Sequence, residues 1–223
     1  MKAKIPNYHS KAKQHVRCAT IIEPARALFG TLKLPENRQY WTMCAQIGDG
    51  ATPYLGGELD QLLQEGFITP DQFHGVEMDP NGYGIHDINV ASVANMPIKP
   101  NLYHNSLESQ LLDAAHDGTL RPGVVYVDDI QGPRKSAELL VRVLGALRNT
   151  SGPTLLVWNS VMSKRYWRVD WPEYNVILNS TYHYKELIAP WDKYDLGGSN
   201  GGWYRGSSEK SDTTMCTVIW CRK

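Results

Sequence analysis

Residues 41–50 read WTMCAQIGDG, an apolar run of strand length that ends in the turn Gly48-Asp49-Gly50. A helical pattern follows the turn, because leucines recur at positions 55, 59, 62 and 63 and Gly66 provides a stop. Strand, glycine turn and helix in this order begin an α/β unit whose turn lies at the carboxyl end of a strand. We therefore expect the fold to be built outward from this turn.

Strands and helices alternate along most of the chain. Strand-like runs are expected at 73–78, 101–104, 124–127 and 154–158, with helices after Ser106 and Pro133. Residues 80–100 are rich in Gly, Asn and Pro and predict a loop or short irregular pieces. Two late strands, at 174–178 and 214–220, have no helix predicted between them. The pattern predicts an α/β fold with a doubly wound, mostly parallel seven-stranded sheet, helices on both faces and a C-terminal antiparallel strand pair.

The length of 223 residues fits one main domain with embellishments. We expect a basic N-terminal arm with short helices at 1–37 and the main domain at 38–223. The long stretch between the last two strands predicts an insert at about 183–213, either a lid or a target-recognition segment.

Charge is balanced overall but unevenly spread. Residues 1–48 hold 8 Lys/Arg and 2 acids, residues 49–130 hold 2 and 13, and residues 131–223 hold 13 and 8. A net charge of zero excludes general electrostatic binding of nucleic acid or acidic membranes. Two interpretations remain open: the opposite charges meet across the folded surface, or the acidic middle holds a cationic ligand and the basic ends face an anionic one.

The location of the protein is predicted from what the sequence lacks. No apolar run approaches the ~20 residues that span a bilayer, and the N-terminus has no signal-peptide core. The four cysteines show neither paired nor zinc-ligand spacing, and the seven histidines show no metal spacing. We expect a cytoplasmic protein with reduced thiols, no metal site and no membrane partner.

Two of the predicted strand ends carry residues suited to a nucleoside. Glycines at 48 and 50 let the backbone turn sharply and approach a ligand closely. Glu77 ends the second strand, where a carboxylate can accept both hydroxyls of a ribose, although a solvated turn acid is the alternative interpretation. Position 53 is Pro, so the third glycine of the dinucleotide fingerprint is missing and pyrophosphate binding is disfavoured.

Four motifs resemble the class I S-adenosylmethionine-dependent methyltransferases, over roughly residues 40–221. Residues 44–52 are similar to the first motif of that family and residues 75–80 to its second. The pair Asn105-Ser106 falls where the family contacts adenine, and residues 124–129 are similar to its fourth motif. The resemblance implies S-adenosylmethionine as cofactor and methyl transfer as the activity. The implied cofactor-binding residues are Gln46, Gly48, Asp49, Gly50, Glu77, Met78, Asn105, Ser106 and Asp128, and the implied catalytic residues are Asp128 and Asp129.

The chain departs from the family at Gln46, where the first motif usually begins with an acid. Replacing a charged hydrogen bond by a neutral one weakens binding by about 1 kcal/mol, roughly fivefold. Two other hypotheses therefore stay open beside the methyltransferase: a non-catalytic cofactor-binding or interaction protein of the same fold, and a nucleotide- or NAD-binding oxidoreductase. Binding of S-adenosylhomocysteine against NAD would separate them.

The acceptor, a small molecule or a nucleic acid, is not determined by the sequence, and neither is assembly into a homo-oligomer. Asp128-Asp129-Ile130-Gln131 is not the Pro-Pro signature of amino-methylating enzymes, and no Pro-Cys pair supports cytosine-C5 chemistry. Residues 163–168, with the sequence SKRYWR, interleave basic and aromatic residues and are suited either to nucleic-acid contact or to a plain surface loop. Trp191, Trp203 and Tyr204 are candidates to line a pocket or to pack a lid.

Overall fold

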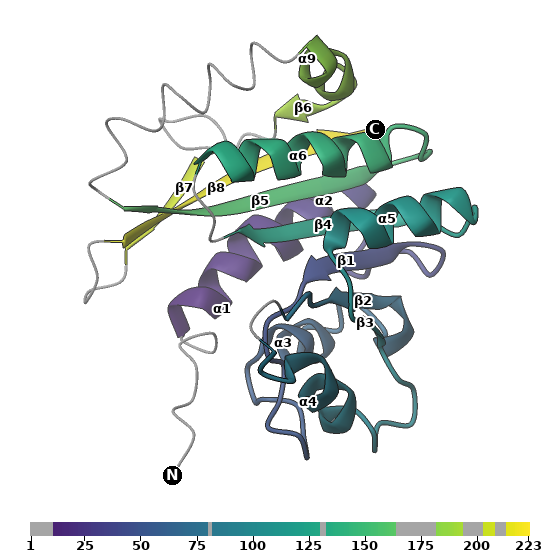
Figure 1. Cartoon of the computed structure of the whole chain (residues 1–223), viewed down its shortest axis with the longest axis vertical. Coiled ribbons are helices and arrows are strands. Elements are labelled where there is room, and N and C mark those ends of the chain that lie inside the picture. Colours follow the sequence, from purple (N-terminus) through teal and green to yellow (C-terminus); the bar gives the residue numbers. More distant parts are fainter. Residues whose placement is uncertain (1–10, 80–81, 130–132, 164–181, 194–202, 208–212) are drawn as a thin grey trace.

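The computed structural model describes residues 11–79, 82–129, 133–163, 182–193, 203–207 and 213–223. Eight strands form one sheet in the order β3-β2-β1-β4-β5-β8-β6, with β7 also paired to β8 (Figure 1). The strands are β1 (Gln39–Met43), β2 (Phe73–Val76), β3 (Asn101–Tyr103), β4 (Pro122–Asp129), β5 (Thr154–Ser163), β6 (Asp192–Lys193), β7 (Trp203–Ser207) and β8 (Thr213–Arg222).

Strand direction divides the sheet into two parts. The strands β3, β2, β1, β4 and β5 are mutually parallel, so their carboxyl ends share one edge. The long β8 runs antiparallel to β5 over ten residue pairs and pairs on its other side with β6 and β7. The expected C-terminal antiparallel arrangement is confirmed, with eight strands in the described sheet where seven were predicted.

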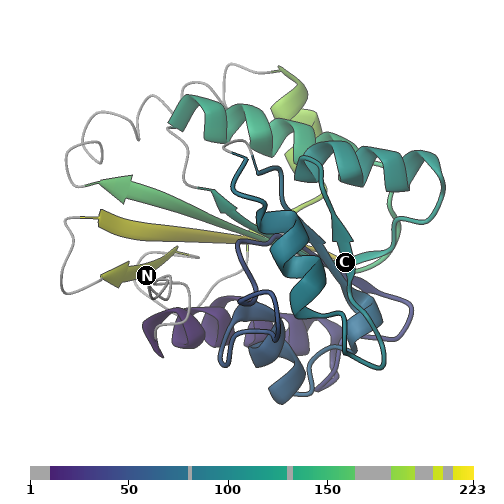
Figure 2. The same ribbon diagram turned by 60° about the horizontal axis from the view of Figure 1, so that its bottom comes forward.

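Helices cover both faces of this sheet (Figure 2). One face carries α5 (Leu107–His116), α6 (Pro133–Leu147) and α9 (Tyr182–Ile188). The other carries α1 (Lys11–Arg17), the π-helix η2 (Cys18–Ile22), α2 (Glu23–Phe29) and α3 (Glu58–Gln64). The remaining elements are the short 3-10 helix η3 (Pro70–Gln72) and α4 (Ile85–Ser92).

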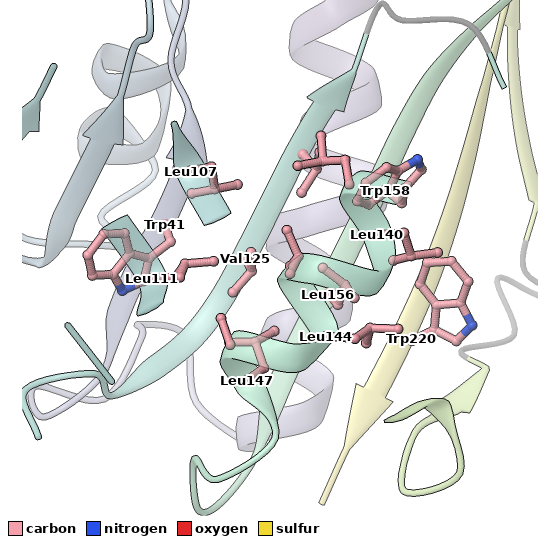
Figure 3. Close-up of a cluster of buried hydrophobic side chains, with 14 of the residues drawn as sticks. Trp41, Leu107, Leu111, Val125, Leu140, Leu144, Leu147, Leu156, Trp158 and Trp220 are labelled. Atoms are coloured by element: carbon pink, nitrogen blue, oxygen red, sulfur yellow. The ribbon is translucent and has the colours of Figure 1, made fainter. Parts of the chain in front are cut away.

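The first hydrophobic cluster lies between the sheet and α5, α6 and α9. The cluster includes alternate strand residues such as Trp41, Val125 and Leu156 together with Leu140 and Leu144 of α6, all at most 1% exposed (Figure 3). These side chains lie on one face because strand residues alternate with period two and helix residues recur at three and four. Full burial of each large apolar side chain contributes about 1.5–3 kcal/mol.

The second cluster lies on the opposite face, against the N-terminal helices. Ile21, Ile22 and Ala25 are fully buried there, so residues 11–29 form a continuous helical run that contributes to the core rather than a peripheral arm. The alternating partners on the sheet are Tyr40, Val124, Tyr126, Leu155 and Val157. The structure does not describe residues 1–10, and the division of the chain into domains stays a prediction.

Two sequence predictions of secondary structure were wrong. Residues 85–92, expected to be loop, form α4, because its polar side chains bond to the turn after β1 and its stability comes from tertiary contacts rather than an apolar stripe. Residues 182–188 form α9 where no helix was expected between the last strands, since it packs on α6. The predicted strand 174–178 lies outside the described residues. Within the described part of the chain, no helix is long and apolar enough to cross a membrane.

Candidate functional site

The turn after β1 is a closed loop fixed by its own polar groups. Asp49 Oδ1 accepts hydrogen bonds from the amides of Ala51 and Thr52, both at 2.9 Å, and these bonds lower the pKa of the Asp49 carboxyl. Gly50 has φ of +92°, a conformation that L side chains rarely adopt, and a Cβ there would meet nothing within 4 Å. Of the two predicted glycines, Gly50 is therefore the one with open space beside it.

Side chains of helix α4 form hydrogen bonds with the backbone in and just before this turn. Asn89 Oδ1 accepts from the Ile47 amide at 2.8 Å, and Asn89 Nδ2 donates to the Ala45 carbonyl at 3.1 Å. The Gly50 amide donates to Ser92 Oγ at 2.9 Å. Asn89 and Ser92 are 1% and 2% exposed, so the turn is anchored by buried hydrogen bonds to a helix that the sequence did not reveal.

The glycine at position 48 is tightly packed on the side where a side chain would lie. A Cβ at this position would overlap with the side chain of Ser92 and with the Thr52 carbonyl. Packing against Ser92 and Thr52 therefore requires a glycine at this position, and the contact of Gly48 with a ligand stays a prediction.

The side chain of Gln46 also forms hydrogen bonds within the turn. Its Nε2 donates to the Gly48 carbonyl at 2.9 Å and contacts the Tyr54 hydroxyl at 3.1 Å. The amide therefore performs a donor role that the acid usual in the resembling family cannot perform.

Glu77 follows β2 at the same edge of the sheet. Its amide donates to the Tyr103 carbonyl at 3.0 Å, which continues the pairing with β3, and its Oε1 accepts from the Asp79 amide at 2.8 Å. The side chain is half-buried. Desolvation raises the pKa of the Glu77 carboxyl, and the nearby Asp79 charge raises it further.

The segment after Glu77 connects this carboxylate to α4. Asp79 has φ of +44° and accepts with its carboxylate from the amides of Tyr83, Gly84 and Ile85, at the start of α4. Met78 is 52% exposed, which leaves an apolar side chain without a covering partner beside Glu77. Through Asp79 and α4, Glu77 and the glycine turn belong to one hydrogen-bonded unit.

The residues after β3 have structural partners. Ser106 caps α5, since the Ser109 amide donates to its Oγ at 3.3 Å as the sequence predicted. Asn105 Oδ1 accepts from the Ser106 amide at 2.8 Å, and its Nδ2 donates to Gln110. Beside them the His104 ring stacks on His86 of α4, with centroids 5.2 Å apart. The side chains of Asn105 and Ser106, the predicted adenine contacts, therefore form hydrogen bonds at the start of α5.

Asp128 lies at the end of β4, opposite Asn159 of β5. Asn159 Nδ2 donates to Asp128 Oδ1 at 2.8 Å, and Asn159 is 3% exposed. The backbone of Asp129 completes β4, while its side chain lies outside the described residues, as do residues 164–168 of the basic and aromatic segment. Of the candidate pocket aromatics, Trp191 belongs to the core, 7% exposed.

A buried polar cluster beneath this edge was missed by the sequence analysis. Tyr40 donates its hydroxyl hydrogen to Glu58 Oε1 at 2.8 Å, and Arg17 lies close enough to lower the pKa of Glu58. Desolvation is the larger effect, and the pKa of Glu58 is raised. Asp128 raises it further, so this cluster reaches the end of β4. The available signal was the recurrence of polar residues at alternate positions of the strands, at 40, 42, 126, 128 and 159.

The strand register brings these groups to one edge. Met43 pairs with Val76, and the Cys44 amide donates to the Val76 carbonyl at 3.0 Å, so the chain leaves β1 and β2 side by side. Burial, followed by the charges of Glu58 and Glu77, raises the pKa of the Cys44 thiol between them. The resulting edge is rich in carboxylates: Asp49, Glu58, Glu77, Asp79 and Asp128. It can favour a cationic ligand and hold hydroxyl groups.

Comparison with known proteins gives a likeness of structure. No protein-family model matches the chain, and no curated protein matches it in sequence. A crystal structure described as a transferase from Pyrococcus horikoshii aligns over 96% of this chain with 12% identity and a TM-score of 0.50. The type IIG restriction endonuclease BpuSI aligns over 95% with 11% identity and a TM-score of 0.53. An O-methyltransferase from Bacillus cereus in complex with SAH aligns over 96% with 12% identity and a TM-score of 0.48.

The chain spans 64% of the Pyrococcus protein, 25% of the endonuclease and 84% of the O-methyltransferase. Five parallel strands in the order β3-β2-β1-β4-β5, continued by the antiparallel β8, agree with the resemblance seen in the motifs. The chain shares its fold with the Pyrococcus transferase and with the aligned part of BpuSI.

Proposed function

We propose that the protein binds S-adenosylmethionine at the carboxyl edge of its sheet and transfers the methyl group to an acceptor. The fold supports this proposal, and the observation that carries it is the hydrogen bonding of the Glu77 carboxylate. The amides of Asp79 and Met78 lie against this carboxylate, which can accept about four hydrogen bonds. Capacity therefore remains for the two hydroxyls of a ribose.

Other residues of this edge also fit an adenosyl group. Gly50 leaves open space at the turn, and the exposed Met78 offers an apolar surface for a flat base next to the ribose acid. Gln46, Gly48 and Asp49 shape the turn, and Asn105 and Ser106 shape the start of α5. We propose that these residues form the walls of the cofactor site, with Gly50, Glu77 and Met78 in direct contact.

The bound cofactor would supply an activated methyl group on a sulfonium cation. The carboxylates of the edge favour that positive charge. Asp128, held at its Oδ1 by Asn159, is placed to orient an acceptor or to take its proton, and we propose Asp129 for the same task. Methyl transfer needs no covalent bond to the protein, so orientation of the two reactants is the main contribution expected of these residues, up to about 7–11 kcal/mol.

Calorimetric titration with S-adenosylhomocysteine, S-adenosylmethionine and NAD tests the proposal. We expect both adenosyl ligands to bind and NAD to bind much more weakly. Glu77→Gln should weaken S-adenosylhomocysteine binding by about tenfold or more, because a charged acceptor is lost. Glu186→Gln, an exposed glutamate on α9, is the matched control and should leave the affinity unchanged. Absence of adenosyl binding at millimolar concentration, or equal affinities for the two variants, would overturn the assignment.

A second candidate function is cofactor binding without catalysis. The observation in its favour is that the Gln46 amide is used inside the turn, where a carboxylate would be expected in an active relative of the resembling family. The two candidates differ in turnover. Incubation with S-adenosylmethionine and separate pools of small molecules and nucleic acids should release S-adenosylhomocysteine in one pool if the protein is an enzyme. Tight binding without release in either pool would favour the second candidate.

A further inference from the structure

The opposite edge of the sheet, where the parallel strands begin, gathers three arginines from distant parts of the sequence. Arg38 and Arg121 precede β1 and β4, which pair at their first residues, Gln39 and Pro122. Arg222 ends β8 and pairs with Thr154, the first residue of β5. Figure 1 shows the C-terminus beside the end of α6, where the Leu147 carbonyl accepts from Arg222 at 3.0 Å.

Two of these guanidinium groups are held by the loop between α6 and β5. Arg38 Nη1 donates to the Ser151 carbonyl at 2.9 Å, and Arg222 Nη2 donates to Thr150 Oγ1 at 2.5 Å. Gly152 makes the room, because a Cβ there would overlap with Arg38 Nη2. The Arg222 guanidinium also lies 5.0 Å above the Trp191 ring. The loop therefore holds both guanidinium groups by hydrogen bonds, and the absence of a side chain at Gly152 leaves space for Arg38.

The positive charge of this cluster is not balanced by acidic side chains. Among the described residues, no carboxylate forms an ion pair with Arg38, Arg121 or Arg222. Arg121 is exposed, and within the part of the chain that the structure describes its guanidinium donates only to the Leu120 carbonyl, at 2.9 Å. Desolvation, followed by mutual repulsion with Arg121, lowers the pKa of Arg38, and Arg38 acts in the same direction on Arg222. Among the described residues, several N–H donors of Arg38 and Arg121 have no acceptor.

We propose that Arg38, Arg121 and Arg222 form a binding site for a phosphate group, either a free phosphate species or a phosphate of a nucleic acid. Guanidinium groups match the geometry of phosphate oxygens and bind them through paired N–H donors. A phosphate would reduce the repulsion between the three cations. It would also accept hydrogen bonds from the guanidinium N–H groups that do not bond to the loop. This site is separate from the carboxylate-rich edge and does not depend on the proposed methyl transfer.

The competing explanation is that these arginines only clamp the loop at residues 150–152. Arg121 separates the two explanations, because it takes no part in the clamp and is exposed. Arg121→Gln should therefore leave the melting temperature of the ligand-free protein unchanged. Lys135→Gln, on the first turns of α6, removes the same charge from an exposed position near the opposite edge and is the matched control.

The test measures binding of inorganic pyrophosphate by calorimetry and of a fluorescent single-stranded oligonucleotide by anisotropy, both at fixed ionic strength. We expect the wild type and Lys135→Gln to bind pyrophosphate alike and Arg121→Gln to bind it about tenfold more weakly. If the phosphate comes from nucleic acid, the oligonucleotide also binds, and Arg121→Gln lowers its salt slope by about 1. If it comes from a free species, only pyrophosphate responds to the variant. Absence of pyrophosphate binding, or equal effects of the two variants, overturns the proposal.

Discussion

Ser92 of α4 fills the space beside Gly48, and its hydroxyl accepts a hydrogen bond from the Gly50 amide at 2.9 Å. The turn of the proposed cofactor site is therefore shaped by a helix residue that lies 42 positions beyond Gly50 in the chain. Because the Asp79 carboxylate accepts from amides at the start of the same helix, movement of α4 would displace both the turn and Glu77, the proposed ribose contact.

Gly48→Ala should destabilise the fold by about 1–3 kcal/mol, because a methyl group must displace Ser92 and press on the Thr52 carbonyl. Ser92→Gly in the same chain should restore only part of this loss, since the carbonyl clash remains. Urea unfolding monitored by tryptophan fluorescence measures both effects. Gly145→Ala is the control: nothing lies within 4 Å of a Cβ there, so helix propensity should make that variant equal to or slightly more stable than the wild type.

Asn89→Leu should cost about 2–4 kcal/mol, because it leaves the Ile47 amide and the Ala45 carbonyl buried without partners. Hydrogen exchange at the Ile47 amide should accelerate by more than at amides of β4, which reports a local effect on the turn. The exposed Asn95 gives a chemically matched control, Asn95→Leu. Equal unfolding free energies for the two variants would show that α4 does not hold the turn.

The affinity for S-adenosylhomocysteine should fall in acid because the proposed ribose contact requires an ionised Glu77. Burial raises the pKa of this carboxyl, so the loss should begin at a higher pH than for an exposed glutamate. Below that pKa the affinity should decline by up to about tenfold for each pH unit, until it reaches the weak affinity of the form with a neutral side chain. Titrations from pH 8 to pH 4 check this. Glu77→Gln should bind weakly with no slope in the same window, and an unchanged slope in that variant would assign the titration to another group.

His74 should make the fold sensitive to acid. Its ring stacks on Trp41 with centroids 4.3 Å apart, and burial lowers its pKa from 6.5 to about 4. The unfolded chain therefore binds the proton more readily than the folded chain. Stability from this group is complete above pH 6.5 and is lost as the pH falls toward 4, by about 3 kcal/mol in total.

His74→Gln tests this account, because glutamine keeps polar atoms at the site but does not titrate. We expect the difference in unfolding free energy between pH 7 and pH 4.5 to shrink in the variant. His116→Gln, at an exposed position, should retain the wild-type difference. A variant that loses stability in acid as steeply as the wild type would rule out His74 as the source.

The motifs that point to the site are local, so the sequence reveals them well. Glu77, which directly follows β2, and Asp128, near the end of β4, were placed at strand ends as predicted, whereas β1 ends at Met43, several residues before the turn at residues 48–50. Ser106 was identified as a helix cap because that signal is also local.

The partners of these residues were not predictable. Nothing in residues 85–92 indicates that Asn89 and Ser92 face a turn 42 residues away in the sequence, and the Gly- and Asn-rich composition around them favours a loop. Glu58 was not identified as a candidate residue from the sequence, yet its carboxylate accepts from Tyr40 and lies near Arg17.

The sequence by itself determined the alternation of the five parallel strands with α3, α5 and α6, because apolar periodicity and turn chemistry act over a few neighbouring positions. Only the tertiary structure decided which of the strand ends share hydrogen bonds, that Gly48 serves packing while Gly50 stays open, and that Arg38, Arg121 and Arg222 meet at the far edge. Such meetings depend on strand order and register, which fix contacts between residues that no local pattern connects.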